Sequence, residues 1–584
     1  MTRETTVEVR STREAAVDPN APIVQVENLE VTFETGMGDV QAVRGVSFEI
    51  FPGETVAIVG ESGSGKSTTA TALIKLLAGN GHVSGGRILV EGKDITSYSE
   101  SQMAGIRGGV IGYVPQDPMS NLNPVWSIGF QVREAIQANG VATGRKAVQA
   151  KAIEVLQQAG LPDAARRMKQ FPHQFSGGMR QRVLIGIGLG AEPRLLIADE
   201  PTSALDVTVQ KVILDHIESL TRDRDTAVLL ITHDLGLAAD RATKLIVMHQ
   251  GKIVESGKSL DILQNPQHPY TKRLIASAPS LASRRIHSSS SATPLTDDDV
   301  PDMLRLATRH EETGSTVEAA PIAVSVKDLR KTYSIRRGGF KSEPLHAVDG
   351  VSFDIHKGTT MALVGESGSG KSTAARLILG LEPPTSGEVV VSGTAMTGVS
   401  RRQLFDLRRR MQVVFQDPYA SLDPQRSIGA IIAEPLKVHR VGDRNSRLER
   451  VEELLDQVAL PTALAHRYPN ELSGGQRQRV AIARALALKP DVVVLDEAVS
   501  ALDVLVQAQI LQLLADLQSE LGLTYLFITH DLAVVRVVAD TVAVMDQGKI
   551  VETGLTDEIF DNAKQSYTQR LLDAIPGSGI RWPS

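Results

Sequence analysis

The chain has 584 residues, of which 42% are hydrophobic and 22% charged, and this length favours two or more domains. Its formal net charge of −6, from 62 basic and 68 acidic residues, gives no general attraction to nucleic acid or anionic lipid. The absence of cysteine from the sequence excludes disulfides and cysteine-ligated zinc or iron–sulfur sites, and it is compatible with a reducing cytosol.

No stretch of the sequence approaches the roughly 20 consecutive apolar residues that a membrane-spanning helix needs. The first residues, MTRETTVEVRSTREAAVDPN, contain no apolar core of a secretory signal. We therefore expect the chain to act on the cytosolic side of a membrane, where any attachment to that membrane goes through a partner.

The two halves of the sequence repeat each other. AVRGVSFEI at 42–50 matches AVDGVSFDI at 347–355, and ITHDL occurs at both 231–235 and 528–532. A period near 300 residues is too long for a solenoid and indicates two copies of one domain. Between the copies lies a segment rich in Ser, Thr and Asp, which predicts a flexible tether. The predicted organisation is a polar tail at 1–21, a first domain at 22–283, a flexible linker at 284–320 and a second domain at 321–584.

The nonapeptide GESGSGKST occurs once in each half, at 60–68 and 365–373. Each copy follows an apolar run typical of a buried strand and precedes a helical pattern. A glycine loop in that setting is a P-loop, whose backbone N–H groups and helix N-terminus hold phosphate. Lys66 and Lys371 are expected to reach the β- and γ-phosphates. The predicted ATP-binding residues of the loops are Gly60, Ser62, Gly63, Ser64, Gly65, Lys66, Ser67, Thr68, Gly365, Ser367, Gly368, Ser369, Gly370, Lys371, Ser372 and Thr373, with Ser67 and Ser372 also as Mg²⁺ ligands.

A second apolar run in each half, LLIADE or VVVLDE, ends in two acidic residues. Asp199 and Asp496 are expected to hold Mg²⁺, and Glu200 and Glu497 to polarise the attacking water as catalytic bases. An apolar strand that ends in two acids is more often only a strand entering a loop. Here both copies have a P-loop upstream and the sequence SALD downstream, which favours the catalytic interpretation.

With these motifs in view, the chain resembles the ABC-transporter ATPases over nearly all of its length outside the tail and linker. LSGGQRQR at 472–479 is the signature sequence of that family, and FSGGMRQR at 175–182 is a variant of it. The resemblance implies an α/β fold with two ABC-type P-loop nucleotide-binding domains in tandem. Each would have a RecA-like α/β core, an antiparallel β subdomain and a helical signature subdomain. It also implies a pseudo-dimer within one chain, in which the domains pair head to tail and each ATP lies between one P-loop and the other signature.

The resemblance assigns roles to further residues, one by one. Phe33 and Tyr333 match the aromatic residue that stacks on adenine, and His233 and His530 match the catalytic switch histidine that contacts the γ-phosphate. Isolated aromatic or histidine residues would more often be core or capping residues, but these occur at matching positions in both halves. The other matches are Gln116 and Gln416 as Mg²⁺-contacting glutamines, Asp206 and Asp503 as D-loop aspartates, and Ser176, Gly177, Gly178, Ser473, Gly474, Gly475 and Gln476 as signature residues that hold the γ-phosphate in trans.

Three kinds of tandem ABC protein lack membrane helices: transporter motors, ribosome-acting factors and DNA-repair ATPases. Ribosome-acting factors usually have a long basic helical linker, and repair ATPases use cysteine-bound zinc; this sequence has neither. The basic segment at 401–410 is best read as a solvated helical face, since no aromatic platform for nucleic acid lies nearby. The segments QDPMSNLNPVWSIG and QDPYASLDPQRSIG, and NPQHPYTKRLIASAP at 265–279, are similar to the peptide/nickel importer ATPases.

This similarity predicts the ATP-hydrolysing motor of an importer, bound peripherally to the cytoplasmic face of the inner membrane. Its implied partners are two transmembrane permease subunits and an extracytoplasmic substrate-binding protein, with no nucleic acid. Peptides are the expected cargo, with nickel chelates, glutathione and other small solutes as alternatives. A soluble tandem ATPase acting on ribosomes or nucleic acid is the alternative function. ATP and Mg²⁺ are the expected cofactors. Neither half has the cysteine-rich motif that many relatives carry after HPYT, so neither an iron–sulfur cluster nor zinc is expected.

The two halves differ at positions that cluster around the signature. Each Gly in place of Ala costs a helix roughly 1 kcal/mol, so the first signature helix is expected to be intrinsically less stable by about 2–3 kcal/mol before packing is counted. Under head-to-tail pairing these changes fall in the site of Lys371, and we expect the Lys66 site to hydrolyse ATP faster; neutral drift is the alternative. The differing residues are Met179 for Gln476, Gly186 for Ala483, Gly188 for Ala485, Gly190 for Ala487, and Pro201 and Thr202 for Ala498 and Val499.

Overall fold

The computed structural model describes most of the chain and divides it into two compact units, one mostly before residue 260 and the other mostly after it. We call residues 21–279 the first lobe and residues 320–578 the second lobe, and describe each by itself. The predicted tail and linker lie almost entirely outside the described residues. The described residues are 21–36, 38–202, 205–279, 320–336, 342–396, 398–500 and 502–578.

The first lobe begins with a four-stranded antiparallel sheet in the order β2-β1-β4-β5. Alternate residues of β1 are buried until a register shift between Val26 and Leu29, where Asn28 adopts a positive φ of 48°. Gly86 lies against this irregularity, and a Cβ there would overlap the Asn28 carbonyl. The strands are β1 (Val24–Thr35), β2 (Gly38–Ile50), β4 (Gly81–Val90) and β5 (Lys93–Asp94).

A six-stranded sheet in the order β10-β9-β3-β8-β7-β6 forms the core of the first lobe. The five strands from β9 to β6 run parallel, and β10 is antiparallel at the edge. The central strands are continuous apolar runs because both faces of a parallel sheet are covered. The strands are β3 (Thr55–Val59), β6 (Ile111–Val114), β7 (Leu195–Asp199), β8 (Ala227–Ile231), β9 (Lys244–His249) and β10 (Lys252–Lys258).

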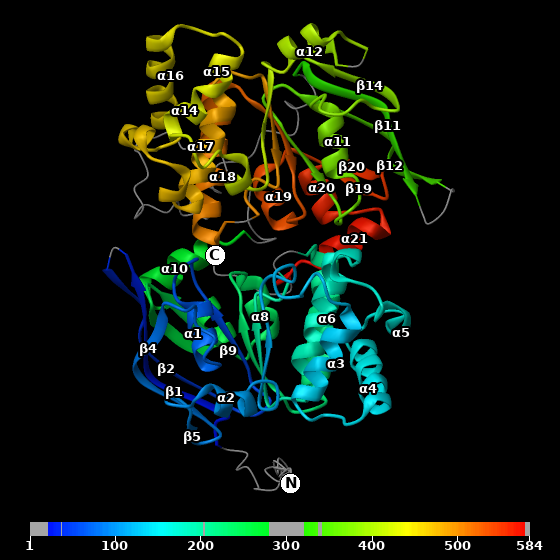
Figure 1. The fold of residues 1–584 in the computed structure, drawn as a ribbon. Coiled ribbons are helices and arrows are strands. Elements are labelled where there is room, and N and C mark those ends of the chain that lie inside the picture. The colour runs from blue at the N-terminus through cyan, green and yellow to red at the C-terminus, as the bar shows by residue number, and fades with distance from the viewer. Residues whose placement is uncertain are drawn as a thin grey trace. The chain divides into compact units, whose positions relative to one another are not determined.

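The helices of the first lobe fall into two groups in Figure 1, since α3, α4 and α6 lie together, away from the blue strands β1, β2 and β4. The helices are α1 (Lys66–Leu73), α2 (Glu100–Ile106), α3 (Ile128–Ala138), α4 (Arg145–Gln158), α5 (Ala164–Arg167), α6 (Gly177–Leu189), α7 (Val207–Arg222), α8 (Leu235–Arg241), α9 (Ser259–Gln264) and α10 (Pro269–Ala276).

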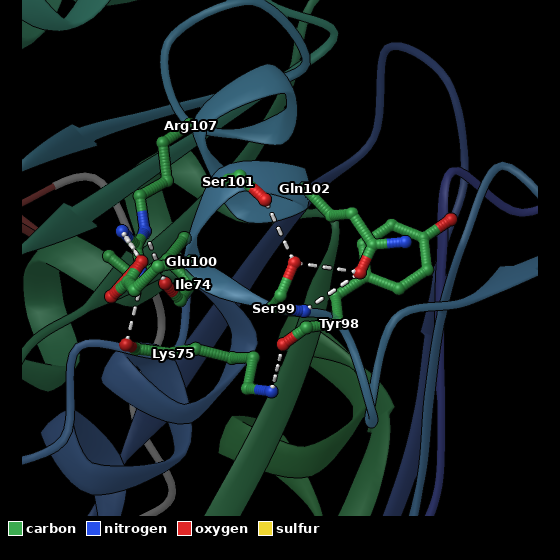
Figure 2. Close-up of polar contacts among 8 residues, drawn as sticks. All are labelled: Ile74, Lys75, Tyr98, Ser99, Glu100, Ser101, Gln102 and Arg107. Atoms are coloured by element: carbon green, nitrogen blue, oxygen red, sulfur yellow. Dashed lines mark hydrogen bonds and ion pairs between the residues drawn. The ribbon is translucent and has the colours of Figure 1, made fainter.

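Helix α2 is capped at its start, and Arg107 at its end fastens it to the end of α1 (Figure 2). At its start, the Ser99 backbone N–H donates to Gln102 Oε1 at 2.8 Å, which satisfies one helix-terminal donor. At its end, the Arg107 guanidinium donates to the carbonyl oxygens of Ile74 and Lys75 at 2.8 and 2.9 Å. These are carbonyls that follow the last turn of α1, so Arg107 acts as its C-terminal cap.

The second lobe repeats this architecture, with sheet orders β12-β11-β14-β15 and β16-β17-β18-β13-β19-β20. Its antiparallel strands are β11 (Ile322–Arg336), β12 (Ser342–His356), β14 (Ser386–Val391) and β15 (Thr394–Ala395). The strands of its core sheet are β13 (Thr360–Val364), β16 (Met411–Val414), β17 (Val492–Asp496), β18 (Thr524–Ile528), β19 (Thr541–Asp546) and β20 (Lys549–Leu555).

The helices of the second lobe differ from those of the first mainly after the glutamine segment. Where α3 is continuous, the second lobe has the two shorter helices α14 and α15, because Pro435 in the first turn of α15 cannot donate to the turn before it. The helices are α11 (Lys371–Ile378), α12 (Arg401–Leu407), α13 (Pro418–Ser421), α14 (Ile428–Ile432), α15 (Glu434–Val438), α16 (Arg444–Gln457), α17 (Gly474–Leu486), α18 (Val504–Leu521), α19 (Leu532–Val538), α20 (Thr556–Asp561) and α21 (Ser566–Asp573).

The predicted fold class is confirmed: each lobe has a mostly parallel α/β core, an antiparallel sheet and a helical group that contains the signature sequence. Among the described residues, no helix has both the length and the apolar character needed to cross a bilayer.

Candidate functional site

The P-loop of the first lobe joins the carboxyl end of β3 to the start of α1. Gly60, Gly63 and Gly65 all have positive φ, at 145°, 78° and 98°, which only glycine adopts without strain. A Cβ on Gly60 would overlap the Met248 carbonyl oxygen, and one on Gly65 would lie 2.7 Å from the Ala42 carbonyl oxygen. A Cβ on Gly63 would meet nothing within 4 Å, so this part of the loop is open to an approaching ligand.

The second lobe has the same loop geometry between β13 and α11. Gly365, Gly368 and Gly370 have φ of 150°, 82° and 107°. Cβ atoms on Gly365 and Gly370 would overlap backbone carbonyl oxygens, and one on Gly368 would meet nothing within 4 Å. In both lobes, therefore, close packing requires two of the glycines, and the middle one faces open space.

The P-loop lysine is held inside each loop by backbone carbonyls. Lys66 Nζ donates to the carbonyl oxygens of Gly60 and Glu61 at 2.8 and 2.7 Å. Lys371 Nζ makes the equivalent bonds at 2.7 and 2.8 Å, and burial lowers the pKa of Lys371. Both side chains are buried, so each lobe keeps a poorly hydrated positive charge beside the loop that is predicted to take the phosphates.

A hydroxyl and a carboxylate meet where α1 begins and β7 ends. Ser67 Oγ donates to Asp199 Oδ1 at 2.9 Å. Burial raises the pKa of Asp199, and burial also raises the pKa of Asp496 in the second lobe, so both carboxylates lie in sites that disfavour an uncompensated negative charge. Hard oxygen ligands of this kind fit Mg²⁺, whose charge would offset the cost of burying the carboxylate.

The predicted catalytic glutamates follow directly after β7 and β17, and each is bonded to the predicted glutamine. Gln116 Nε2 donates to Glu200 Oε2 at 2.8 Å, and Gln416 Nε2 donates to Glu497 Oε2 at 2.7 Å. The structure thus brings together residues that lie more than 80 positions apart in the sequence. Both glutamates adopt a positive φ, 44° and 49°, which an ordinary side chain avoids at a cost of about 1 kcal/mol.

In the second lobe the glutamate also faces the predicted switch histidine. His530 Nδ1 lies 3.4 Å from Glu497 Oε1. Burial alone would raise the pKa of Glu497, but the hydrogen bond and charge of His530 outweigh burial and lower it. Burial likewise opposes the charged form of His530, yet Glu497 raises the pKa of this histidine. The pair therefore favours an ionised carboxylate, the form that can accept a proton from water.

Each signature serine caps the helix that follows it. Ser176 Oγ accepts from the Met179 N–H at 3.4 Å at the start of α6, and Ser473 Oγ accepts from the Gln476 N–H at 3.3 Å at the start of α17. In the second lobe Gln476 Oε1 also accepts from the Ser473 N–H at 3.1 Å, completing a capping box that Met179 cannot make. Both helices have 13 residues, and such an N-terminus favours an anion.

The predicted aromatic, D-loop and histidine residues have the following local contacts and positions. The Phe33 ring lies against Gly81, where a Cβ would clash with it, while the Tyr333 hydroxyl donates to Glu382 Oε2 at 2.6 Å. Asp206 and Asp503 each accept a backbone N–H at the start of the following helix, at 3.0 and 3.1 Å. His233 follows β8 just as His530 follows β18.

In each lobe an arginine of the signature helix contacts the segment that follows the predicted glutamine. The sequence analysis did not predict these contacts. The Arg477 guanidinium lies 3.8 Å from the centroid of the Tyr419 ring, and Arg180 contacts the Met119 sulfur. The signature sequence contains these arginines, but nothing local in it indicates which distant residue they reach. The contacts connect the signature helix of each lobe with the segment that begins at its glutamine.

Two family models match the chain, and each matches it once in each half. The family model described as "ABC transporter" matches residues 43–203 and 348–500, and the model "Oligopeptide/dipeptide transporter, C-terminal region" matches residues 254–300 and 551–583.

Two relatives and one solved structure illustrate the similarity. The chain is 44% identical over 562 residues to the glutathione import ATP-binding protein GsiA of Salmonella paratyphi A, covering 95% of this chain and 89% of that protein. It is 43% identical over 605 residues to the oligopeptide transport ATP-binding protein OppD of Mycobacterium bovis, covering 95% and 98%. The solved structure of cbiO1 from Clostridium perfringens, part of the ABC transporter complex cbiONQ, is 30% identical. The match covers 41% of this chain and 91% of the cbiO1 chain, with a TM-score of 0.37.

Proposed function

The chain belongs to the ABC transporter family of ATP-binding proteins, and from that premise we propose that it drives the import of peptides or peptide-like solutes through separate permease subunits. It is an ATPase with two P-loop lobes in one chain. The observation that carries the ATP-hydrolysing part of the proposal is the meeting of the P-loop lysine, the Ser67–Asp199 pair and the Gln116–Glu200 pair at the carboxyl edge of one parallel sheet.

The residues at that edge have complementary tasks in phosphoryl transfer. The loop N–H groups and Lys66 are proposed to bind the β- and γ-phosphates, where fixed donors stabilise the charge that develops in the transition state. Ser67 and Asp199 are proposed to hold Mg²⁺, which supplies further neutralisation of the phosphate oxygens when bound. Glu200 is proposed to accept a proton from the attacking water, with Gln116 fixing the orientation of its carboxylate.

We further propose that each signature helix completes the ATP site of the other lobe, as the family resemblance implies. Support within each lobe comes from the capped N-terminus of a 13-residue helix, which offers a hydroxyl and backbone N–H groups to a phosphate. Under this proposal one lobe binds ATP but hydrolyses it only when the other lobe contributes its serine.

The proposed cargo class rests on the terminal segments and on the relatives. Both lobes match the model for the C-terminal region of oligopeptide and dipeptide transporters, and the named relatives serve glutathione and oligopeptide import. Short peptides are therefore the proposed cargo, delivered by an extracytoplasmic binding protein to two permease subunits. The ATPase is proposed to sit at the cytoplasmic face of the inner membrane through those subunits.

The test removes both P-loop lysines by Lys66→Ala and Lys371→Ala. ATP hydrolysis is expected to fall at least ~100-fold and uptake of a labelled tripeptide to stop, because the phosphates lose a fixed positive charge in each loop. Lys151→Ala is the matched control, since this lysine lies on α4 and pairs with the surface residues Glu154 and Glu192. Thermal unfolding should be unchanged in all variants. Tripeptide import that survives the double substitution, or co-purification of ribosomal proteins in place of permeases, would refute the proposal.

A further inference from the structure

Tyr567 of helix α21 reaches the P-loop of its own lobe. Its hydroxyl oxygen accepts the Glu366 backbone N–H at 3.1 Å, although the two residues are 201 positions apart in the sequence. The tyrosine side chain is buried, with an exposed fraction of 8%. It lies within residues 551–583, which the model of the oligopeptide/dipeptide transporter C-terminal region matches. A residue outside every P-loop motif therefore contacts the backbone of the P-loop.

Helix α21, red in Figure 1, is held on the core sheet beside the strand that leads into the P-loop. Tyr567 and Leu571 belong to the apolar cluster that includes residues of β13 and β19. At the start of the helix, Glu552 of β20 accepts the backbone N–H groups of Lys564 and Gln565 at 2.7 and 3.2 Å. The Tyr567 hydroxyl thus approaches the loop from a helix that is fixed at its start and along one face.

Glu366, which Tyr567 contacts, also holds the P-loop lysine. Its carbonyl oxygen accepts from the Ser369 N–H at 3.1 Å and from Lys371 Nζ at 2.8 Å. Lys371 Nζ also donates to the Gly365 carbonyl oxygen at 2.7 Å. The peptide group between Gly365 and Glu366 is therefore held from two sides, by Lys371 at its oxygen and by Tyr567 at its nitrogen. The position of the Lys371 ammonium group is linked to α21 through this one peptide group.

The tyrosine hydroxyl is chemically suited to this place. Burial raises the pKa of Tyr567 to about 12, so the phenol stays neutral at physiological pH. It can therefore accept the N–H without bringing a negative charge toward the phosphates. A carboxylate acceptor at this position would repel a triphosphate.

We propose that Tyr567 is a positioning residue for the second P-loop, and that the segment containing α21 thereby raises the affinity of the second lobe for ATP. This inference rests on the proposed function, in which that loop binds the phosphates. Without the hydroxyl, the Glu366 N–H loses its acceptor in a partly buried site, and the loop samples other arrangements. Only molecules whose loop is correctly arranged bind ATP, so the apparent affinity falls. Glu497 keeps its contacts with Gln416 and His530, so the proposed base stays in place.

The test measures binding of the fluorescent nucleotide mant-ATP to the full chain carrying Lys66→Ala, so that the second P-loop supplies the signal. Tyr567→Phe keeps the ring and removes only the hydroxyl. Its Kd should rise about 3–10-fold, the range expected for one hydrogen bond. Tyr525→Phe is the matched control, because the Tyr525 hydroxyl is also buried in this lobe but donates to the Leu514 carbonyl oxygen at 2.9 Å. The control should change the Kd less than ~2-fold.

Glu552→Ala tests whether the support of α21 matters. It should raise the Kd in the same direction, by about 2–5-fold, and add nothing to Tyr567→Phe in the double variant, because both act through the same hydroxyl. A partly unfolded sample would lower the fraction of chains that bind mant-ATP and leave the Kd unchanged, so lost folding and lost positioning are separable. If Tyr567→Phe does not fold, Glu552→Ala carries the test with the same expectation.

Three results would overturn the inference: an unchanged Kd in Tyr567→Phe, an equal change in Tyr525→Phe, or additive effects of Tyr567→Phe and Glu552→Ala. The proposed function has a separate check in the same Lys66→Ala chain. Lys371→Ala should abolish mant-ATP binding there. Binding that survives Lys371→Ala would overturn the proposed role of the second P-loop, whatever the Tyr567 variant shows.

Discussion

The glycines of the first signature helix, α6, test how that helix packs, because helix propensity and packing predict different results for them. Propensity alone predicts that alanine at Gly186 and at Gly188 stabilises α6 by about 1 kcal/mol each. The structure places these two glycines against different neighbours, and the difference decides the expected sign of each substitution.

At Gly186 an added Cβ would lie 3.3 Å from the Ala159 Cβ and from a Val155 methyl, beside a small pocket that the same side chains line. These are side-chain atoms of α4 and of its C-cap residue next to free space, so they can shift by a few tenths of an ångström. Gly186→Ala should then keep the propensity gain, with a net stabilisation of about 1 kcal/mol.

At Gly188 an added Cβ would lie 3.0 Å from a Val114 methyl and 3.1 Å from the Tyr113 carbonyl oxygen. Both belong to β6, a strand held in the core sheet. The approach is mutual, because a Cβ on Gly112 of the same strand would overlap the Gly188 carbonyl. Overpacking of this kind costs about 1–3 kcal/mol, so after the propensity gain of about 1 kcal/mol is subtracted, Gly188→Ala should destabilise α6 by up to about 2 kcal/mol.

Hydrogen exchange of the peptide covering residues 177–189 measures the local opening of α6, which is appropriate because the two lobes need not unfold together. About 1 kcal/mol corresponds to a roughly fivefold change in protection, slower for Gly186→Ala and faster for Gly188→Ala. Ala485→Gly in α17 is the matched control and should lower protection about fivefold in its own helix only. Equal changes of the same sign at positions 186 and 188 would show that packing against β6 does not decide the outcome.

Three further predictions concern the ATP sites. Glu200→Gln and Glu497→Gln should each lower steady-state ATP turnover about 10²–10⁴-fold at the affected site, with the larger loss of total activity from Glu200→Gln; equal losses would remove the predicted inequality of the sites. Asp199→Asn should raise the Mg²⁺ concentration needed for half-maximal hydrolysis, and an unchanged Mg²⁺ titration would contradict its assignment as a ligand. Tyr333→Ala should weaken ATP binding to the second P-loop by about 1–3 kcal/mol in fluorescent-nucleotide titrations, whereas Tyr333→Phe should cost less than about 1 kcal/mol; equal effects would exclude stacking as the main contribution.

The local elements of the site were predictable from the sequence because their signals are local. A glycine loop after an apolar run places a P-loop between β3 and α1, and Ser176 and Ser473 sit at helix starts as their sequence context indicates. The repeat also predicted the same α/β fold for both halves.

The contacts within the site were harder to predict, because they depend on which strands become neighbours. In the order β3-β8-β7 a single strand, β8, lies between the P-loop strand β3 and the strand β7 that ends in Asp199. More than 100 residues separate β3 from β7 along the chain. The Gln116–Glu200 bond follows from the pairing of β6 with β7, because Gln116 lies just beyond β6 and Glu200 just beyond β7. The contact of Arg477 with Tyr419 follows from the packing of α17 beside α13 in the second lobe.

Packing also changed the meaning of one sequence difference. Helix propensity presents Gly188 only as a weak point of its helix, but the structure shows that an added side chain there would press against the Val114 methyl and the Tyr113 carbonyl of β6. The predicted intrinsic weakness of the first signature helix therefore cannot be summed over its glycines as if all were exposed.

The backbone of Glu200 and Glu497 has a consequence for laboratory evolution of this protein. Both residues keep a conformation that glycine or asparagine would adopt more comfortably, so replacement by either would relieve strain at the cost of the carboxylate. A screen that rewards heat resistance alone should thus enrich inactive variants at these two positions. Selection for heat resistance has to be combined with selection for turnover if the engineered protein is to remain a motor.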